Sequence, residues 1–473
     1  MDEGRKLSDP ESRGRTIHFV SLGCPKNRVD TERMVALATG QGMRLVADPA
    51  DSEVIVVNTC GFIGPAKQES VETVLELARH KETGRCRTLV MTGCLSQRYP
   101  EELARELPEV DHFLGTSDLP RLGEILSRRD EARLAVGRPE GLAEAEFGRQ
   151  LLGPAHTAHL KISEGCNRPC AFCIIPLMRG AQRSRTLPSL LEEARTLVAS
   201  GVRELILVAQ DTTVYGSDLA GEQETDLVAL LEALSSLEGL VWIRLHYTYP
   251  SAVDRRLVEA MATLPKVAPY IDMPLQHVDD EVLRRMRRGY GEKKVRETIA
   301  LLREAMPKVA IRTTLLTGHP GETDAAHARL LAFLEEVELD HVGVFPFSPE
   351  EGTPSHDLPD AVPEKVARAR AKEVMALQRK ISRRRLKRLR DEVLEVMVDG
   401  PSEESEFLLQ GRHGGQSPEI DGVVILTDGT AQPGEVVRAR VIKCSDYDLV
   451  ASIEQAEEHA PDGGDSGRGA TSR

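Results

Sequence analysis

Short apolar runs rich in β-branched residues alternate with segments of helical periodicity through most of this 473-residue chain. In the first part the apolar runs are Ile17–Leu22, Val54–Val57 and Thr88–Met91. The helical segments that follow them are Asp30–Gly40, Ala66–Arg79 and Pro100–Leu107. Strands that alternate with helices are typical of a parallel sheet covered on both faces. The pattern predicts an α/β fold, with a flexible tail at 1–14, an amino-terminal parallel sheet domain at 15–130 and a linker at 131–150.

The alternation resumes after this linker. Six candidate strands are His159–Ile162, Glu204–Ala209, Val241–Leu245, Tyr270–Met273, Val309–Leu316 and His341–Phe347, with helical segments such as Leu187–Ser200, Asp226–Leu237 and Val278–Arg288 between them. Six such units over about 220 residues suit a full or partial βα barrel, although the pattern also allows an open sheet. We expect this barrel at 151–362.

The remaining chain changes character twice. A connecting helix is predicted at 363–390, with Val366, Val374, Leu377, Ile381 and Leu389 on one stripe. Residues 391–456 then alternate and carry the turn pairs Asp399-Gly400, Asp421-Gly422, Asp428-Gly429 and Pro433-Gly434. This pattern predicts a small antiparallel β-barrel. The last segment, 457–473, is rich in Gly, Ser and Asp and is expected to be disordered.

Composition narrows the cellular setting. No apolar run reaches the ~20 residues that a bilayer span needs, and the polar start of the chain is unlike a secretory signal. We therefore expect a cytoplasmic protein without a membrane partner, in which the eight cysteines serve as metal ligands or catalytic groups rather than disulfides. The net charge of −14 argues against a general nucleic-acid binder, although a local basic patch can act alone.

Three cysteines lie close together directly after the first strand of the second series, at Cys166, Cys170 and Cys173. Three thiolates from one loop can hold a [4Fe–4S] cluster and leave one iron without a protein ligand. An open iron can chelate a small molecule through amino and carboxylate groups. The alternative is a zinc knuckle, but zinc usually takes a fourth protein ligand, and His159 lies within the preceding strand.

Cys24, Cys60 and Cys94 are far apart in sequence, but each follows the end of an apolar run. The ends of parallel strands meet at one edge of a sheet, where such folds bind ligands. Neighbouring glycines, Gly23, Gly61 and Gly93, leave room for a bulky inorganic group near the backbone. The pattern favours a second cluster, while the alternative is that each thiol is a buried small hydrophobe. Cys86 and Cys444 lack this placement and are interpreted as structural.

The C-x3-C-x2-C spacing, with an aromatic residue before the last cysteine, resembles that of the radical S-adenosylmethionine superfamily. The resemblance implies that Cys166, Cys170 and Cys173 are catalytic cluster ligands and that Phe172 lies near the adenine of the cofactor. A bound cofactor of this kind supplies the reactive chemistry, and the protein supplies orientation and exclusion of water.

Nearly the whole chain, residues 15–456, resembles the methylthiotransferases, which combine an amino-terminal cluster domain, a radical S-adenosylmethionine barrel and a carboxy-terminal TRAM barrel. Its motifs resemble most the branch that modifies ribosomal protein S12. These motifs are Ser21–Asn27, Asn58–Ile63, Ala66–Ser70, Gln210–Thr212 with Tyr215–Gly216, and Pro274–His277.

This resemblance implies two [4Fe–4S] clusters and S-adenosylmethionine as both radical source and methyl donor. The implied reaction removes a hydrogen from the β-carbon of an aspartate in ribosomal protein S12 and attaches a methylthio group there. The implied partners are S12, free or on the small ribosomal subunit, a low-potential electron donor of flavodoxin or ferredoxin type, and a sulfur source.

Other barrel residues are implied as cofactor contacts. Gly318 and Glu322 belong to a loop that resembles a cofactor-contacting one, although a Gly–Pro–Gly turn is common. Gln276 and His277 end a candidate strand and could face cofactor or substrate, while a strand-end histidine is as often a hydrogen-bonded structural group. His319 departs from the pattern, because an aromatic or apolar residue is expected there.

Charge bears on the substrate. Residues 391–455 contain 14 Asp or Glu and 4 Lys or Arg, whereas a barrel that grips RNA should be basic. The acidic barrel suits a basic ribosomal protein. Against this, eight of the twelve residues 379–390 are Lys or Arg, which is either a solvated helix face or a contact to ribosomal RNA. Two other hypotheses stay open: a tRNA methylthiotransferase acting on a modified adenosine, and a non-catalytic iron–sulfur carrier.

Overall fold

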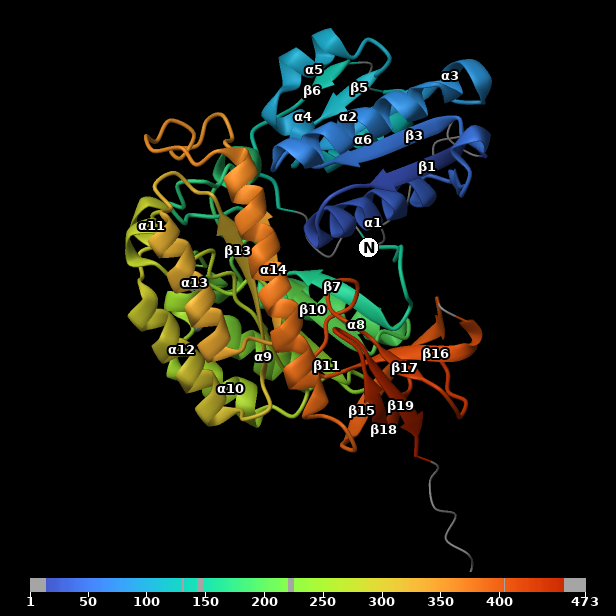
Figure 1. Ribbon diagram of the computed structural model, residues 1–473. Coiled ribbons are helices and arrows are strands. Elements are labelled where there is room, and N and C mark those ends of the chain that lie inside the picture. Colours follow the sequence, from blue (N-terminus) through green and yellow to red (C-terminus); the bar gives the residue numbers. More distant parts are fainter. Residues whose placement is uncertain (1–13, 130–131, 143–147, 220–224, 404, 455–473) are drawn as a thin grey trace, which may run out of the picture.

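The computed structural model describes residues 14–129, 132–142, 148–219, 225–403 and 405–454 and folds them into three domains (Figure 1). The expected flexible tail, apart from Gly14, and the expected disordered segment 457–473 lie outside the described residues. In Figure 1 the amino-terminal domain lies above the βα barrel, and the carboxy-terminal barrel packs beside it.

The amino-terminal domain is a six-stranded sheet in the order β2-β1-β3-β4-β5-β6, and every neighbouring pair is parallel. Its strands are β1 (Thr16–Ser21), β2 (Arg44–Leu45), β3 (Val54–Thr59), β4 (Thr88–Gly93), β5 (His112–Leu114) and β6 (Leu134–Ala135). Its helices are α1 (Pro25–Gly40), α2 (Gly64–Ala78), α3 (His80–Thr83), α4 (Cys94–Arg98), α5 (Pro100–Glu106) and α6 (Leu119–Leu126), with a 3₁₀ turn, η1, at Pro49–Asp51. All six residues of β3 are buried, as expected for a strand covered on both faces.

Two local features of this domain extend beyond the sequence-based expectation. The first helix begins at Pro25, five residues before the predicted Asp30, because a proline at the first helical position needs no backbone donor. The strand β6 lies inside the segment 131–150 that was expected to be a linker, and it pairs with β5 through Leu134 and Phe113. A two-residue strand carries no alternation that a sequence pattern could reveal.

The second domain is a six-stranded sheet in the order β14-β13-β12-β11-β10-β7. Its strands are β7 (Thr157–Lys161), β10 (Glu204–Val208), β11 (Trp242–Leu245), β12 (Val267–Asp272), β13 (Ala310–Thr317) and β14 (His341–Pro346). A small hairpin of β8 (Ser163–Glu164) and β9 (Arg183–Ser184) lies beside them. Since all neighbours are parallel and follow chain order, the sheet winds in one direction, as in a partial βα barrel.

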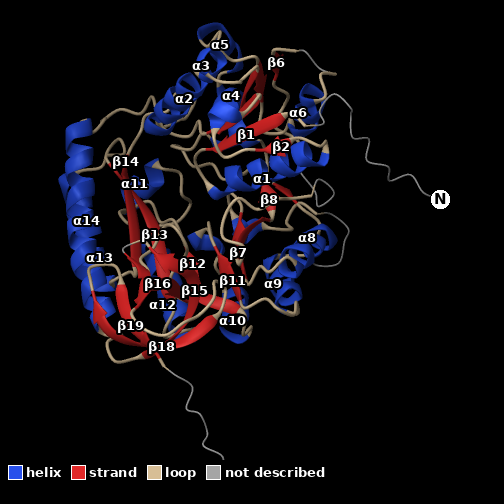
Figure 2. Ribbon diagram, turned by 90° about the vertical axis from the view of Figure 1, so that its right-hand side faces the viewer, coloured by secondary structure: helices blue, strands red, loops and turns tan. Residues whose placement is uncertain are grey.

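The helices of this barrel lie on its outer side (Figure 2). They are α7 (Ile175–Arg179), α8 (Leu187–Ala199), α9 (Leu227–Ser235), α10 (Arg255–Thr263), α11 (Asp280–Arg285), α12 (Glu292–Ala305) and α13 (Asp324–Val337), with 3₁₀ turns η3 at Thr212–Val214 and η4 at Pro250–Ala252. Side chains from strands and helices form one continuous apolar core. None of the helices in the described part of the chain has the length and apolar content needed to cross a bilayer.

The connecting helix α14 (Glu364–Lys387) packs along β14 and α13 and reaches the carboxy-terminal barrel (Figure 1). Its buried face includes Ala367, Ala371, Val374 and Ile381. The inclusion of Val366 in the predicted stripe is wrong, because Val366 is 37% exposed. The small Ala367 takes the buried position instead. It packs directly against Gly318, where any side chain would collide with it.

The carboxy-terminal domain is a closed five-stranded barrel of β15 (Val393–Ser402), β16 (Ser405–His413), β17 (Val424–Leu426), β18 (Val436–Cys444) and β19 (Leu449–Ile453). Four of its five pairs are antiparallel, as expected. The pair β17–β19 is parallel, because the directions of five strands in a closed ring cannot alternate at every pair, so at least one neighbouring pair must run the same way.

A buried carboxylate joins the first two domains. Glu193 of α8 receives Arg33 of α1 at 2.8 Å, Arg149 at 3.0 Å and Arg185 at 2.6 Å. Arg149 also pairs with Glu32 of α1 at 2.5 Å. Burial acts to raise the pKa of Glu193, but the surrounding guanidinium groups outweigh it and lower the pKa to about 2. The carboxylate is therefore charged across the physiological range.

A second buried carboxylate joins the βα barrel to the carboxy-terminal barrel. Glu204 of β10 pairs with Arg412 of β16 and with Arg244 of β11, each at 2.7 Å, and all three side chains are buried. Arg244 also donates to the carbonyl of Gly414 at 2.7 Å. The chain therefore docks both flanking domains onto the βα barrel through carboxylates that are each shared by several arginines.

We predict that Glu193→Gln lowers the free energy of unfolding at neutral pH by about 3–5 kcal/mol, because it leaves buried guanidinium groups without their anion. Glu192→Gln, at the exposed neighbouring position, is the matched control and should change little. Chemical denaturation of the three proteins measures the difference. The gap between wild type and Glu193→Gln should shrink as the pH falls from about 4.5 toward about 2, where the native carboxylate takes up a proton. Equal stability of the two variants at pH 7 would contradict the prediction.

Candidate functional site

The three amino-terminal thiols converge at one edge of the first sheet. Cys24 follows β1, Cys60 follows β3 and Cys94 is the first residue after β4. These three strands are adjacent and parallel, with Ser21 opposite Asn58 and Thr59 opposite Gly93. The strand order reverses between β1 and β3, and the crevice at such a point is where open α/β sheets bind ligands. The predicted convergence of these thiols is what this topology produces.

Glycines allow the three cysteine segments to approach one another. Gly23 has φ +89°, and a Cβ there would lie 2.8 Å from Cβ of Cys60 and 3.1 Å from its Sγ. A Cβ at Gly61 would lie 2.9 Å from the carbonyl carbon of Cys94. Gly23, next to Cys24, thus lies against Cys60, and Gly61, next to Cys60, lies against Cys94.

The amino-terminal thiols are removed from water to different degrees. Burial raises the pKa of Cys60 to about 11, and it also raises the pKa of the fully buried Cys94. Arg179 donates through Nε to Sγ of Cys94 at 3.3 Å and partly offsets that burial. Since metals bind the thiolate, binding at this site would be coupled to release of protons.

The central trio lies in the loop between the strand pair at Glu164 and the helix α7. The backbone N–H of Cys166 donates to the carbonyl of Gly180 at 3.1 Å, and that of Cys173 donates to the carbonyl of Cys170 at 3.1 Å. Gly165 has φ +80°, and a Cβ there would lie 2.0 Å from the carbonyl oxygen of Ala181. The start of the loop is therefore held against Gly180 and Ala181 by a close approach that requires glycine at 165, and its end forms a turn from Cys170 to Cys173.

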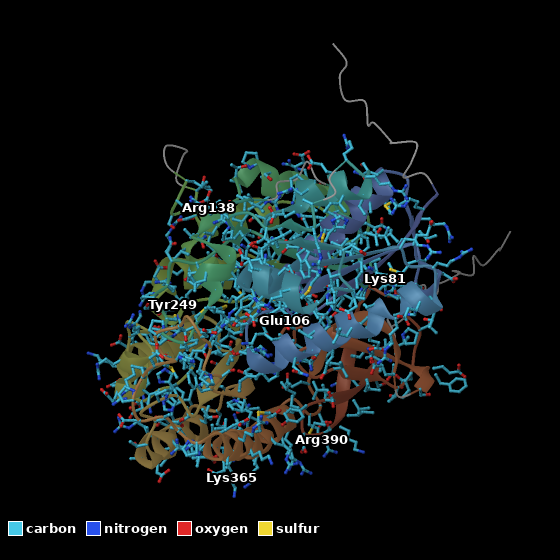
Figure 3. All side chains as sticks on the ribbon, turned by 90° about the horizontal axis from the view of Figure 1, so that it is seen from above. Lys81, Glu106, Arg138, Tyr249, Lys365 and Arg390 are labelled. Atoms are coloured by element: carbon cyan, nitrogen blue, oxygen red, sulfur yellow. The ribbon has the colours of Figure 1, made fainter. Side chains whose placement is uncertain are left out.

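Hydrogen-bond donors point at two sulfurs of this loop. The backbone N–H of Arg168 donates to Sγ of Cys166 at 3.4 Å, and Nη1 of Arg288 donates to Sγ of Cys170 at 3.2 Å. Burial raises the pKa of Cys173 to about 12. Tyr249, labelled in Figure 3, lies with its ring centroid 3.9 Å from the guanidinium of Arg168 and 4.3 Å from that of Arg288. Donors to sulfur are a main means by which proteins tune iron–sulfur groups.

One amino-terminal thiol contacts the segment that follows the central loop across the domain interface. Cys94 packs against Ile174 and Met178, in the segment that directly follows Cys173. Arg179 ends that segment and reaches Cys94 and, through Nη2 at 2.5 Å, Oδ1 of Asn27. One short stretch of chain therefore links the central loop to the amino-terminal thiols.

An ion-pair layer surrounds this link. Arg179 pairs with Asp30 of α1 at 2.8 Å and with Glu164 at 3.1 Å. Lys161 contacts both of these carboxylates, and its Nζ lies 2.7 Å from Oε2 of Glu164. Gln210 donates to the other oxygen of Glu164 at 2.7 Å. Burial acts to raise the pKa of Glu164, but the two cations outweigh it and lower the pKa well below its usual value.

Two residues expected near the cofactor are placed on the barrel side of the central loop. Phe172 packs against the cluster of Val282, Met286 and Ala326. Gln276 follows β12 with φ +70°, and its backbone bridges to Leu315 of β13. Left-handed backbone at a non-glycine residue stores strain, which occurs mostly at functional positions. Their contact with a cofactor stays a prediction.

The expected loop at Gly318 is built into the protein interior. Glu322 is buried, and its carboxylate accepts the backbone N–H of Gly318 and lies 3.6 Å from His277 and 3.4 Å from Arg370. A Cβ at Gly318, where φ is +81°, would lie 2.2 Å from Cβ of Ala367. His277 is fully buried, and its Nδ1 accepts from the backbone N–H of Asp279 at 3.0 Å. These contacts position the loop, and its role in cofactor binding stays a prediction.

His319, which departs from the expected apolar pattern, behaves as a neutral packed ring. It is fully buried, with Nε2 2.8 Å from Oγ of Ser355 and its ring edge-on to Phe347 at 5.2 Å. Burial lowers its pKa to about 4. Cys86 and Cys444 also pack within apolar cores, Cys86 in the amino-terminal domain and Cys444 in the carboxy-terminal barrel.

The donor sets suit iron–sulfur groups in their chemistry. All eight cysteines are free of disulfides. In the described part of the chain, no three His, Cys, Asp or Glu side chains form a compact site for a single metal ion. Each trio instead combines thiols from one edge or loop, close backbone approach at glycine, and nitrogen donors aimed at sulfur. Soft thiolates of this kind bind Cu(I), zinc and iron–sulfur clusters, and three thiols without a fourth protein ligand fit a cluster better than a zinc ion.

Several residues at this interface were not singled out from the sequence. Arg179 and Arg288 each donate to a cysteine sulfur, and Asp30, Lys161 and Glu164 surround the link. Arg179 carries a weak signal, since it stands six residues after Cys173 in the same loop and helix. Arg288 carries none, because only the fold brings its helix segment beside the loop.

Cavities at the interface lie beside these thiols rather than over them. A cavity of about 130 Å³ is lined by Asp30, Lys161 and Glu164 together with the strand ends at Asn58 and Gly93. A larger cavity of about 490 Å³ lies where the three domains meet, between Arg28, His159 and Arg412. Cysteine does not line either cavity.

Comparison with known proteins adds family information. The radical SAM superfamily model matches residues 160–334, the model named uncharacterized protein family UPF0004 matches 16–115, and the TRAM domain model matches 392–453. The protein named ribosomal protein uS12 methylthiotransferase RimO from Sorangium cellulosum is 50% identical over 461 residues, covering 96% of this chain and 93% of that protein. The protein of the same name from Geobacter sulfurreducens is 48% identical over 440 residues, covering 92% of this chain and 98% of that protein.

Among solved structures, the radical S-adenosylmethionine methyltransferase TsrM from Kitasatospora setae, with cobalamin and a [4Fe–4S] cluster bound, is similar at a TM-score of 0.53. It is 15% identical in sequence, and the match covers 73% of this chain and 77% of that one. At this identity the likeness concerns the fold alone.

We predict that Gly23→Ala destabilises the metal-free chain more than Gly201→Ala does. Both glycines have positive φ, but a Cβ at Gly201 meets nothing within 4 Å, whereas one at Gly23 meets Cys60. Gly201→Ala should lose about 1–2 kcal/mol from left-handed strain alone. Gly23→Ala should lose a further ~1–3 kcal/mol from overpacking against the thiol. Urea denaturation followed by circular dichroism measures both, and equal losses would show that Gly23 is not in contact with Cys60.

Proposed function

The chain belongs to the RimO family of ribosomal protein uS12 methylthiotransferases, and from this premise we propose that it attaches a methylthio group to the β-carbon of an aspartate in uS12. The family assignment makes it a radical S-adenosylmethionine enzyme. The aspartate, the β-carbon and the number of clusters are parts of the proposal. Because the substrate is a ribosomal protein, we place the reaction in the cytoplasm.

The observation that carries this proposal is the contact between the amino-terminal trio and the segment that directly follows the central trio. A methylthio transfer needs one site that activates a carbon and another that delivers sulfur to the same carbon. Cys94 of the amino-terminal trio packs against Ile174, the residue after Cys173 of the central trio. A single substrate side chain held at the domain interface can therefore face both sites.

We assign the two trios to two [4Fe–4S] clusters. Cys166, Cys170 and Cys173 would hold the one that binds S-adenosylmethionine, and Cys24, Cys60 and Cys94 would hold the one that presents sulfur. When bound, these groups supply the radical, the sulfur and the methyl group, with electrons from a flavodoxin- or ferredoxin-type donor and sulfur from a separate source.

The residues of this chain orient those groups and exclude water. Arg288 and the backbone of Arg168 donate to sulfurs of the central loop, and Arg179 donates to Cys94. We infer that Phe172, Gln276, Gly318 and Glu322 shape the S-adenosylmethionine side of the barrel. Gly318 and Glu322 would act by positioning the loop, since their contacts are internal.

Charge supports a protein rather than an RNA substrate. Five of the eight cations at residues 379–390 pair with carboxylates of the chain itself: Arg379, Arg383, Arg384, Arg385 and Arg388. Arg390, labelled in Figure 3, lies at the outer edge of the molecule in that view. These pairs partly neutralise the basic run, although Arg379, Arg383 and Arg388 remain about 60% exposed. The acidic carboxy-terminal barrel complements a basic ribosomal protein.

We predict that the anaerobically reconstituted enzyme, with reductant and S-adenosylmethionine, adds the mass of a methylthio group to uS12 and not to tRNA. Mass spectrometry of both substrates measures the outcome. Addition to tRNA alone would replace the proposal with the tRNA-modifying alternative. A lack of 5′-deoxyadenosine under these conditions would favour the non-catalytic carrier instead.

We also predict that removal of either trio leaves about half of the iron and sulfide, as two separate [4Fe–4S] sites require. One variant combines Cys166→Ala, Cys170→Ala and Cys173→Ala, and the other combines Cys24→Ala, Cys60→Ala and Cys94→Ala. Cys444→Ala is the control and should retain all the iron. Iron and sulfide analysis of anaerobically purified protein tests this. Loss of all iron in either triple variant, or none, would contradict separate sites.

A further inference from the structure

Lys26 is a buried cation beside the amino-terminal thiols. It lies in the first turn of α1, two residues after Cys24, and is 7% exposed. Among the ion pairs found in the described residues, none includes Lys26. A charge removed from water is unfavourable unless a partner compensates it, and the groups beside Lys26 are the ring of Tyr247 and the thiol of Cys24.

The other interface cations are engaged with protein groups. Arg179 and Lys161 share Asp30 and Glu164, and Arg168 pairs with Asp211 at 2.6 Å. Arg288 donates to Cys170, to the carbonyl of Pro274 and to the hydroxyl of Tyr290. Lys26 differs from these neighbours in that no carboxylate pairs with it among the described residues, and its neighbours are the ring of Tyr247 and the thiol of Cys24.

Tyr247 holds the ammonium group in place. Nζ of Lys26 lies 3.3 Å from the centroid of the Tyr247 ring. Tyr247 is the second residue after the end of β11, and its backbone has a left-handed φ of +58°. Its backbone N–H donates to Asp272 at 3.1 Å, and its carbonyl accepts from Thr212 at 3.1 Å. A strained conformation fixed by two hydrogen bonds is characteristic of a positioned functional group.

The Lys26–Tyr247 pair spans the region between the two thiol trios. Lys26 extends from the segment that carries Cys24, in the amino-terminal domain. Two residues beyond Tyr247, the ring of Tyr249 contacts Arg168 and Arg288, whose donors reach the central cysteine loop. A ligand anion bound at Lys26 would therefore lie within the interface that both trios share.

We propose that Lys26, positioned by Tyr247, binds the side-chain carboxylate of the substrate aspartate and so selects aspartate over uncharged residues. This inference rests on the proposed function, because it assigns the recognition of that substrate. The ring contacts the ammonium group, and an ammonium group carries three N–H donors that a carboxylate can accept. A charge-assisted hydrogen bond at this place would hold the β-carbon, one bond from the carboxylate, between the two sites.

The test compares two peptides on the reconstituted full-length enzyme with S-adenosylmethionine and without reductant. One peptide spans the modified aspartate of uS12, and the other has asparagine at that position. Fluorescence anisotropy gives both dissociation constants for the wild type, Lys26→Met and Lys26→Arg. We expect the wild type to prefer the aspartate peptide by about ten- to a hundredfold, as the loss of a hydrogen bond to a charged group implies. Lys26→Met should bring the ratio close to one, and Lys26→Arg should keep most of it.

Each other outcome overturns the inference. A wild type that binds the two peptides equally would overturn it without any variant, and so would Lys26→Met with an unchanged ratio. Loss of iron in Lys26→Met, with both peptides weakened alike, would assign Lys26 to the cluster instead. These results are distinct from failure of the proposed function, which would appear as a wild type that does not methylthiolate uS12 at all.

Discussion

Asp30 and Glu164 share the cations of Lys161 and Arg179 where the amino-terminal sheet meets the βα barrel. Lys161, Glu164 and Arg179 are buried and Asp30 is partly exposed, so the buried charges depend on one another for compensation. The layer therefore has one satisfactory arrangement, in which the edge of the first sheet faces the central cysteine loop. The position of the two trios relative to each other follows from that facing, because each trio lies within a single domain.

Arg179 connects this ion-pair layer to the amino-terminal thiols. Its guanidinium binds two carboxylates, the amide oxygen of Asn27 and the sulfur of Cys94 at the same time. Its planar fork of five donors suits such a junction, which a lysine could not reproduce. Since Arg179 ends the segment that begins at Cys173, the docking of the domains and the surroundings of Cys94 are coupled through one side chain. Glu193 and Glu204 repeat the principle at the two interfaces, each as a carboxylate shared by several arginines.

The fold was largely predictable because its signals are local. Apolar β-branched runs mark β3 and β4, and helical periodicity marks the helices between the strands, so the parallel sheets follow from the pattern. The differences have physical causes that are not local. The two-residue β6 is too short to show alternation, and Val366 is displaced from the buried face by the close contact of Ala367 with Gly318. The parallel pairing of β17 with β19 depends on how the barrel closes.

Of the candidate site, the sequence by itself determined the six cysteines and their two groupings. The sequence shows that these residues are cysteines and that each follows a predicted strand. Parallel strands bring their carboxyl ends to one edge of the sheet. Only the tertiary structure decided which groups surround them. Arg179, Arg288, Lys26 and Tyr247 come from segments whose sequence separation conveys nothing about contact, and only the fold and the docking of the domains bring them beside the thiols. The position of one thiol trio relative to the other is thus set by the docking of the two domains. Ion pairs between the domains specify that docking, and the local sequence pattern does not.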